Sequence, residues 1–382
     1  MKKILRYTLI VLFLFVNHHA CQTIDSSFIP ADNADIQYTG RINFKNRNAP
    51  IIYWPGTSII ANFEGTSIKV KLNDKNGENY FNVFIDNDTE NPIIIACKKG
   101  LNIYDVASGL KKGIHKIEVF KRTETWEGPT IFYGFILDGG KSLKPPPQKS
   151  GLRIEFYGNS ITSGMGNEDF VGNDNQNSAK KNNYLAYGAI TARKLNAQYH
   201  CISKSGIGIM ISWFNQVMPE FYNRLDPDAD DEETNSQWNF KSWIPDIVVI
   251  NLFQNDSWLV EMPEHEQFKK RFPEGTAPKP NEIEEAYISF VRTIRAKYPR
   301  AHIICALGNM DATKVGKAWP GYIRNAVDKI RVIDKDNRIY TCFFPFKNTP
   351  AHPTVRENEV MATQLTMFIK KEILKKSVGS KQ

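Results

Sequence analysis

A serine and a histidine that lie far apart in this chain could form a nucleophile and its base. Ser160 stands in the pentapeptide 158–162, GNSIT, and His352 stands in the tripeptide 351–353, AHP. A serine hydroxyl attacks a carbonyl efficiently only when a base removes its proton, and histidine suits that task near neutral pH. Each motif is ordinary turn or capping sequence when taken alone, so the chemistry depends on a fold that brings the two together.

Two more motifs could stabilise the negative charge that such an attack creates. Gly206 lies in the segment 205–208, SGIG, where a missing side chain lets a backbone N–H approach an oxyanion. Asn255 lies in the segment 251–256, NLFQND, and its amide could donate to the same oxygen, a contact worth roughly 3 kcal/mol. A loop glycine and a capping asparagine are the alternative interpretations.

The elements that must position these residues are read from the second half of the chain. Apolar runs predict strands at residues 154–157, 198–202, 247–252 and 303–304. Helical patterns open near 184, cover 282–297 and 322–333, and begin again near 356. This alternation predicts a parallel sheet flanked by helices, in which reactive residues belong at the carboxyl ends of the strands.

The first half of the chain has a different pattern. Between residues 35 and 140, short stretches of alternating polarity such as SIKVKL (67–72) are separated by turn-forming sequences, which is typical of an antiparallel sandwich. The segment 144–147, KPPP, is a stiff linker. We therefore expect an all-β domain over 21–143 and an α/β domain over 149–378.

The extreme amino terminus has the layout of a secretory signal. Three basic residues precede a short apolar run over 7–16, and small Ala20 precedes Cys21, so residues 1–20 are a predicted signal peptide. We expect an exported protein that is periplasmic, secreted or held at the outer membrane by a lipid on Cys21. Without these residues the formal charge falls from +8 to +5, and no basic stripe argues for nucleic acid as a partner.

Neither a metal nor an organic cofactor is expected. The cysteines show no close spacing typical of a zinc or redox site, and a disulfide cannot be read from them. The acidic run 226–233 lacks the ligand spacing of a calcium loop and is interpreted as a solvated turn. Trp258, close after Asn255, is either a platform for a sugar ring or a core aromatic, and the segment 259–280 is a surface loop that could wall the cleft.

The order Ser160, Gly206, Asn255, His352 in one α/β domain resembles the SGNH or GDSL hydrolase superfamily. The sandwich, with segments GRI (40–42), WPGTSI (54–59) and FEGTS (63–67), makes the whole mature chain similar to family 2 carbohydrate esterases. The resemblance implies a flavodoxin-like three-layer α/β fold preceded by a jelly-roll sandwich. It also implies a serine esterase, acetylxylan esterase-like, that removes acetyl groups from plant-type polysaccharides or oligosaccharides.

Two positions depart from the superfamily pattern. Asn159 stands where an aspartate usually precedes the serine, and Thr349 stands where an aspartate is usual three residues before the histidine. The resemblance to family 2 esterases, some of which use a Ser-His dyad whose histidine is held by a backbone carbonyl, implies that Ser160 and His352 work as a dyad. Residues 348–351 are one source expected for the carbonyl that orients His352. The oxyanion donors implied are the amides of Ser160 and Gly206 and the side chain of Asn255.

Two alternatives stay open at this point. One is an esterase of the same superfamily that acts on another acyl group. The other is a carbohydrate-binding protein whose second domain is not catalytic, although the presence of all four SGNH residues counts against it.

Overall fold

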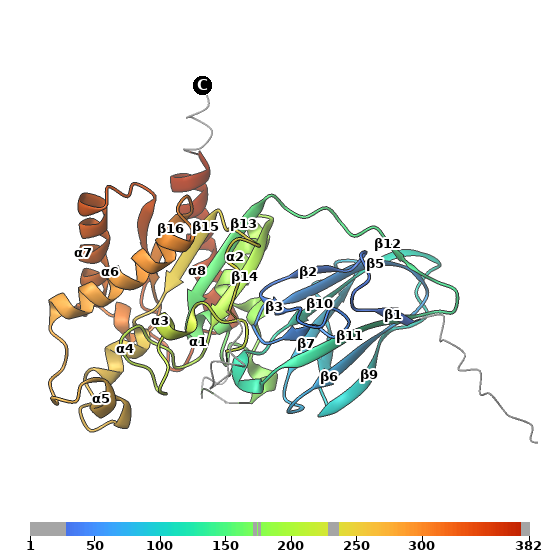
Figure 1. Cartoon of the computed structure of the whole chain (residues 1–382), viewed down its shortest axis with the longest axis horizontal. Helices are drawn as coiled ribbons and strands as arrows, with labels where there is room; N and C mark the ends of the chain where they lie inside the picture. Colours follow the sequence, from blue (N-terminus) through green and yellow to red (C-terminus); the bar gives the residue numbers. More distant parts are fainter. Residues whose placement is uncertain (1–27, 171–173, 175–176, 228–236, 376–382) are drawn as a thin grey trace, which may run out of the picture.

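The computed structural model describes residues 28–170, 174, 177–227 and 237–375, so the predicted signal peptide and Cys21 lie outside the described residues. The predicted fold class is confirmed: a β-sandwich precedes a parallel-sheet α/β domain (Figure 1). None of the helices in these ranges combines the length and apolarity that a membrane span requires.

Two six-stranded antiparallel sheets form the sandwich. One sheet has the order β3-β4-β11-β6-β9 with β1 beside β11, and the other has the order β12-β5-β10-β7-β8 with β2 beside β5. Alternate residues of the long strands point into a common core, as the alternating polarity requires. The strands are β1 (Phe28–Pro30), β2 (Gln37–Thr39), β3 (Ile42–Asn43), β4 (Ile51–Ile52), β5 (Ser58–Gly65), β6 (Ile68–Asp74), β7 (Tyr80–Ile85), β8 (Ile93–Ala96), β9 (Gly100–Ala107), β10 (Gly113–Lys121), β11 (Thr130–Leu137) and β12 (Leu143–Lys144).

The α/β domain is built on five parallel strands in the order β14-β13-β15-β16-β17. This order reverses beside the first strand of the domain, and ligands bind in such sheets at the carboxyl end of that switch point. The strands are β13 (Leu152–Gly158), β14 (Ala197–Ser203), β15 (Ile247–Asn251), β16 (His302–Leu307) and β17 (Ile339–Phe343). Four of them match predicted strands, and β17 was missed.

Helices cover both faces of this sheet (Figure 1). Residues of α6 (Pro280–Lys297) and α7 (Trp319–Ile333) share one core cluster with the sheet, and residues of α2 (Tyr187–Lys194) and α8 (Val355–Ile369) share the other. The segment predicted as a surface loop over 259–280 contains a short helix, α5 (Glu266–Arg271). Shorter helices are α1 (Ser160–Ser163), α3 (Met218–Phe221) and α4 (Gln254–Leu259), with single turns at η1 (Thr125–Glu127), η2 (Ser178–Lys180), η3 (Asn183–Leu185), η4 (Asp311–Thr313) and η5 (Lys370–Leu374).

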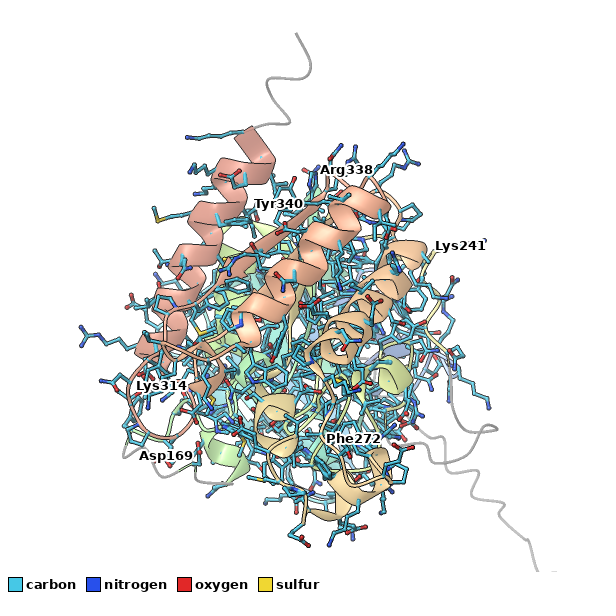
Figure 2. The ribbon with its side chains drawn as sticks, turned by 90° about the vertical axis from the view of Figure 1, so that its left-hand side faces the viewer. Asp169, Lys241, Phe272, Lys314, Arg338 and Tyr340 are labelled. Carbon is cyan, nitrogen blue, oxygen red and sulfur yellow. The ribbon has the colours of Figure 1, made fainter. Side chains whose placement is uncertain are left out.

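The sheet ends can be located by eye in Figure 2. Arg338 and Tyr340, at the start of β17, lie at the upper end, and Asp169 and Lys314 lie at the lower end with the loops that follow the strands. The lower end is therefore the carboxyl edge, where reactive residues are expected.

The two domains share their cores. Trp54 of the sandwich is fully buried in the α/β domain, where its ring meets Phe221 edge-on at 5.1 Å. On the other face of the sheet, Phe84 and Phe120 pack on Tyr184 with centroid distances of 4.5 and 5.1 Å. Because apolar side chains of one domain complete the interior of the other, the domains form one packed unit.

A buried ion pair also crosses the domain boundary. The Arg41 guanidinium of the sandwich donates to Glu155 on β13 at 2.9 Å and to the hydroxyl of Tyr157 at 2.8 Å, and both charged side chains are fully buried. Arg41 also donates to the carbonyl of Tyr222. Such a pair stabilises the fold only while both charges keep their partners. Either charge left alone in the interior would destabilise it.

We therefore expect Arg41→Ala to lower the free energy of unfolding by about 3–5 kcal/mol, because it leaves Glu155 as an uncompensated buried charge. Urea unfolding followed by fluorescence and circular dichroism checks this, and both signals should change in one transition. Lys69→Ala is the control, because Lys69 pairs with Asp105 at an exposed site and should cost at most about 1 kcal/mol. An Arg41→Ala loss as small as that of the control would contradict the role given to the buried pair.

Candidate active site

Ser160 lies directly at the carboxyl end of β13. Asn159 follows the last residue of the strand and caps α1, because its side-chain oxygen accepts from the backbone N–H of Ile161 at 3.1 Å. Gly158 is required just before it, since a Cβ there would lie 2.0 Å from the hydroxyl oxygen of Thr162. Ser160 becomes the first residue of a helix, and its own N–H has no acceptor among the described residues. The residue is 6% exposed.

His352 reaches Ser160 from the segment between β17 and α8. Its Nε2 lies 2.8 Å from the Ser160 hydroxyl, which is hydrogen-bonding distance for proton transfer. The loop before it is held by Lys347, whose ammonium donates to the carbonyls of Thr349 and Pro350 at 2.9 and 2.7 Å. The structure thus brings together the two predicted residues, which are 192 positions apart in the chain.

The expectation that a backbone carbonyl orients His352 is wrong. The Asp174 carboxylate lies 2.6 Å from His352 Nδ1, and the same oxygen accepts from the His352 backbone N–H at 2.7 Å. Three groups are therefore in line instead of the two of a dyad, although Thr349 occupies the usual position of the aspartate. An aspartate that accepts from Nδ1 keeps Nε2 free of its proton and ready to act as a base.

The electrostatics of Asp174 suit this contact. Partial burial acts to raise the pKa of the carboxyl group, but the hydrogen bonds and charge of His352 outweigh it and hold the pKa below its ordinary value. Asp174 has a φ of 49°, a left-handed conformation that aspartate tolerates better than most residues. Sequence reasoning missed it because the surrounding stretch 166–177, rich in Gly, Asn and Asp, has no periodic pattern and is not adjacent to the histidine.

Gly206 and Asn255 lie side by side as potential oxyanion donors. Asn255 gives one N–H to the carbonyl of Ile207 at 2.8 Å and accepts from the Trp213 indole at 3.1 Å, so the direction of its amide is fixed. An amide nitrogen has two N–H groups, and the second has no acceptor among the described residues. Gly206 has a φ of 88°, and its backbone N–H likewise has no acceptor in the described part of the chain.

The loop that carries Gly206 is shaped by Asp256, the neighbour of Asn255. The fully buried Asp256 carboxylate accepts from the backbone N–H groups of residues 209, 210 and 211 at 3.0, 2.7 and 3.2 Å. Gly208 allows this approach, because a Cβ there would lie 2.6 Å from an Asp256 oxygen. Burial raises the pKa of Asp256 to about 6, even though the three backbone donors act to lower it.

Aromatic residues surround this loop. Trp258, the predicted sugar platform, is partly buried against a core cluster and donates through its indole to Asp311 at 3.2 Å. Its role as a platform stays a prediction. Two tryptophans that the sequence did not single out, Trp126 and Trp213, are 48% and 42% exposed, and both contact the loop that holds Gly206.

No group of three or more potential metal-ligating side chains occurs in the ranges that the structure describes. Of the acidic run 226–233, most positions lie outside those ranges, and Asp226 accepts from the Tyr53 hydroxyl at 2.8 Å. The four cysteines of the described ranges are buried and free of disulfides: Cys97, Cys201, Cys305 and Cys342.

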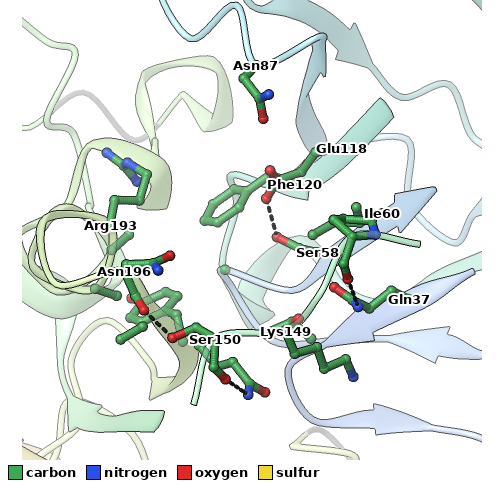
Figure 3. A pocket seen from close by; sticks show the side chains of 18 of the residues that line it. Gln37, Ser58, Ile60, Asn87, Glu118, Phe120, Lys149, Ser150, Arg193 and Asn196 are labelled. Carbon is green, nitrogen blue, oxygen red and sulfur yellow. Dashed lines mark hydrogen bonds between the residues drawn. The ribbon is translucent and has the colours of Figure 1, made fainter. Parts of the chain in front are cut away.

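A cavity of about 350 Å³ lies between the domains, away from Ser160 (Figure 3). Glu118 and Lys149 come to it from the sandwich and the linker, Arg193 comes from the end of α2, and Asn196 follows that helix. Its wall includes Gln198 near the start of β14, which is the amino end of the sheet, whereas Ser160 follows the carboxyl end of β13. The cavity therefore lies apart from Ser160 and His352.

Comparison with known proteins agrees with this architecture. Residues 38–147 match the family described as carbohydrate esterase 2 N-terminal. A solved family two carbohydrate esterase from Clostridium thermocellum, in complex with cellohexaose, superposes with a TM-score of 0.78 and 29% identity, over 88% of this chain and 99% of that one. The family match covers the sandwich domain, and the likeness to the solved family two esterase extends over both domains of the chain.

The chain is also similar in sequence to curated proteins. The cellulase/esterase CelE of Acetivibrio thermocellus is 30% identical over 355 residues, which are 91% of this chain, but the chain spans only 41% of the length of that protein. An acetylxylan esterase / glucomannan deacetylase of Cellvibrio japonicus is 25% identical over 348 residues, 88% of this chain and 89% of that protein.

The raised pKa of Asp256 predicts a pH effect on stability. Between about pH 4 and pH 6 the folded protein binds this proton more tightly than the unfolded chain, so the contribution of Asp256 to stability falls as pH rises. A shift of about two units corresponds to about 3 kcal/mol. The measurement is urea unfolding of the wild type and of Asp256→Asn at several pH values. We expect the difference in their free energies of unfolding, wild type minus variant, to fall by about 3 kcal/mol between pH 4 and 7. Asp88→Asn, at an exposed carboxylate, is the control, and a pH-independent difference for Asp256→Asn would contradict the assignment.

Proposed function

We propose that the protein is a carbohydrate O-deacetylase that removes acetyl groups from polysaccharides or oligosaccharides through an acetyl-enzyme intermediate. The observation that carries the proposal is the alignment of Ser160, His352 and Asp174, with contacts of 2.8 and 2.6 Å, at the carboxyl edge of the parallel sheet. A serine, an imidazole and a carboxylate in this order are the working parts of a serine esterase. No step requires a metal or an organic cofactor.

The first half of the reaction forms the acetyl-enzyme. His352 Nε2 takes the proton of the Ser160 hydroxyl as its oxygen attacks the acetyl carbonyl, and Asp174 stabilises the imidazolium that results. The carbonyl oxygen becomes an oxyanion, and the available donors are the N–H groups of Ser160 and Gly206 and the second N–H of Asn255. The sugar then leaves as an alcohol after its oxygen takes the proton from His352.

The second half releases acetate. A water molecule replaces the sugar, gives a proton to His352 Nε2 and attacks the acetyl carbon, and the same donors stabilise the second oxyanion. Collapse of this intermediate returns the proton to Ser160 and frees acetic acid. Every atom that enters as ester and water leaves as alcohol and acid.

The choice of an acetylated carbohydrate comes from the relatives, of which one is named acetylxylan esterase / glucomannan deacetylase and another is solved with cellohexaose. The small exposed area of Ser160 and the exposed indoles of Trp126 and Trp213 nearby support a small acyl group next to a sugar. The alternative of a non-catalytic binding protein is disfavoured because the contacts of Ser160, His352 and Asp174 are complete.

We expect Ser160→Ala and His352→Ala to abolish acetate release, and Asp174→Asn to lower kcat by about 10²–10⁴, because an amide no longer stabilises the imidazolium. The measurement is hydrolysis of 4-nitrophenyl acetate by purified, folded variants. Asp88→Asn, at an exposed site, should match the wild type. If Asp174→Asn kept activity within about threefold of the wild type, the histidine would work without the carboxylate.

Substrate choice is tested separately. We expect acetate release from acetylated xylan or glucomannan, and we expect 4-nitrophenyl octanoate to react at least about tenfold more slowly than the acetate ester, because a long chain must find apolar area near a nearly closed serine. Acid release is titrated for each substrate at equal enzyme concentration. Equal rates on both aryl esters would favour an esterase for other acyl groups, and no reaction on any ester would favour the binding protein.

A further inference from the structure

The loop that carries Gly206 is held by the sandwich domain as well as by its own domain. Ser205, the residue before Gly206, donates its backbone N–H to one oxygen of Glu124 at 2.6 Å and its hydroxyl to the other oxygen at 2.6 Å. Its carbonyl accepts from the indole of Trp126 at 3.1 Å. Every polar group of Ser205 is therefore bonded to residues of the sandwich.

The turn that supplies these contacts is itself rigidly held. Glu124 is 1% exposed and precedes the turn η1, which contains Trp126. The fully buried ammonium of Lys121 donates to the carbonyls of Thr123 and Glu124, both at 2.9 Å. Because buried charges cannot move without losing their partners, the position of the Glu124 carboxylate is strongly fixed.

A second buried lysine fixes the carboxylate itself. Lys181 of the α/β domain lies 3.4 Å from Glu124 and 2.5 Å from Glu127. Burial alone would lower the pKa of the Lys181 ammonium, but the two carboxylates hold it above its usual value. Lys181 therefore stays charged and joins η1 to the α/β domain.

On the other side of Gly206, the loop is fixed from within the α/β domain by Asp256, which accepts from the backbone of residues 209–211. The N–H of Gly206 thus lies between two carboxylate anchors, Glu124 before it and Asp256 after it. Glu124 belongs to a different domain and does not contact the reacting atoms.

We propose that Glu124 is a positioning residue for the oxyanion site, so that the sandwich completes the geometry in which Gly206 and Asn255 receive the developing charge. The proposal rests on the proposed esterase function and adds a catalytic purpose for the first domain. A donor displaced by a fraction of an ångström still binds substrate but stabilises the transition state less, so the loss should fall on kcat.

The test compares two buried glutamates of the same turn. Glu124→Ala removes both bonds to Ser205, whereas Glu127→Ala removes a carboxylate that binds Lys181 and Ser178 but not Ser205. On 4-nitrophenyl acetate we expect Glu124→Ala to lower kcat at least about tenfold with KM within about twofold, and Glu127→Ala to leave kcat within about twofold. The pH dependence of kcat should not move, because the contact between His352 and Asp174 is untouched.

A conservative variant separates positioning from loss of folding. In Glu124→Gln the amide can accept from the Ser205 N–H and donate to the Ser205 hydroxyl, so we expect it to recover most of the kcat lost in Glu124→Ala. Thermal unfolding of all three variants identifies any that do not fold. If kcat fell equally in Glu124→Ala and Glu127→Ala, or in neither, the proposal would be overturned.

A second readout does not depend on turnover. Amide hydrogen exchange across residues 205–208 should be faster in Glu124→Ala than in the wild type and in Glu127→Ala, because the loop has lost an anchor. If the wild type hydrolysed no ester, the proposed function would be wrong, and exchange alone would decide whether Glu124 holds the loop. Unchanged exchange in Glu124→Ala would overturn the inference in either case.

Discussion

The arrangement of the site depends on the parallel register of three neighbouring strands. Gly158 at the end of β13 pairs with Ser203 at the end of β14 and with Asn251 at the end of β15. Because these strands run in one direction and stop at one level, the segments that follow them emerge side by side. Ser160, Gly206 and Asn255 each lie within four residues of such a strand end. Small slips in the register would separate Ser160 from both Gly206 and Asn255.

Charged groups inside the molecule keep these segments in place. Asp256 holds the Gly206 loop, Lys347 holds the turn before His352, and Arg41 with Glu155 joins the two domains. Burying an ion is unfavourable unless hydrogen bonds and opposite charges replace its water. Each of these groups has hydrogen-bond partners that offset part of the cost of burial. The geometry becomes specific, since few other arrangements satisfy the same groups.

Sequence patterns predicted the fold class well because its strands and helices are strongly periodic. The first four residues of β15, IVVI, are apolar, and the whole strand is buried, so its type was clear. The strand β17, IYTCF, was missed because three of its residues are only partly buried, a pattern that is typical of an edge strand. The four candidate residues of the SGNH pattern could be identified in the sequence because three of them follow predicted strands and one precedes a predicted helix.

The rest of the candidate site could not be read from sequence, since it depends on contacts between segments that no local pattern links. Asp174 lies in an aperiodic stretch and reaches His352 across 178 positions of the chain. Glu124 and Trp126 belong to the other domain and meet Ser205 only after the domains pack. Charged residues in such places look like solvated surface until the structure shows what they contact.

The shared cores have a consequence for how this architecture can vary. Tyr53 and Trp54 belong to one core of the α/β domain, and Phe84 and Phe120 belong to the other, although all four come from the sandwich. An α/β domain cut away at the linker would expose both interiors to water and would lose apolar contacts that it cannot replace. The sandwich is therefore a structural part of the α/β domain's interior, not an exchangeable module of the kind that binding domains often are.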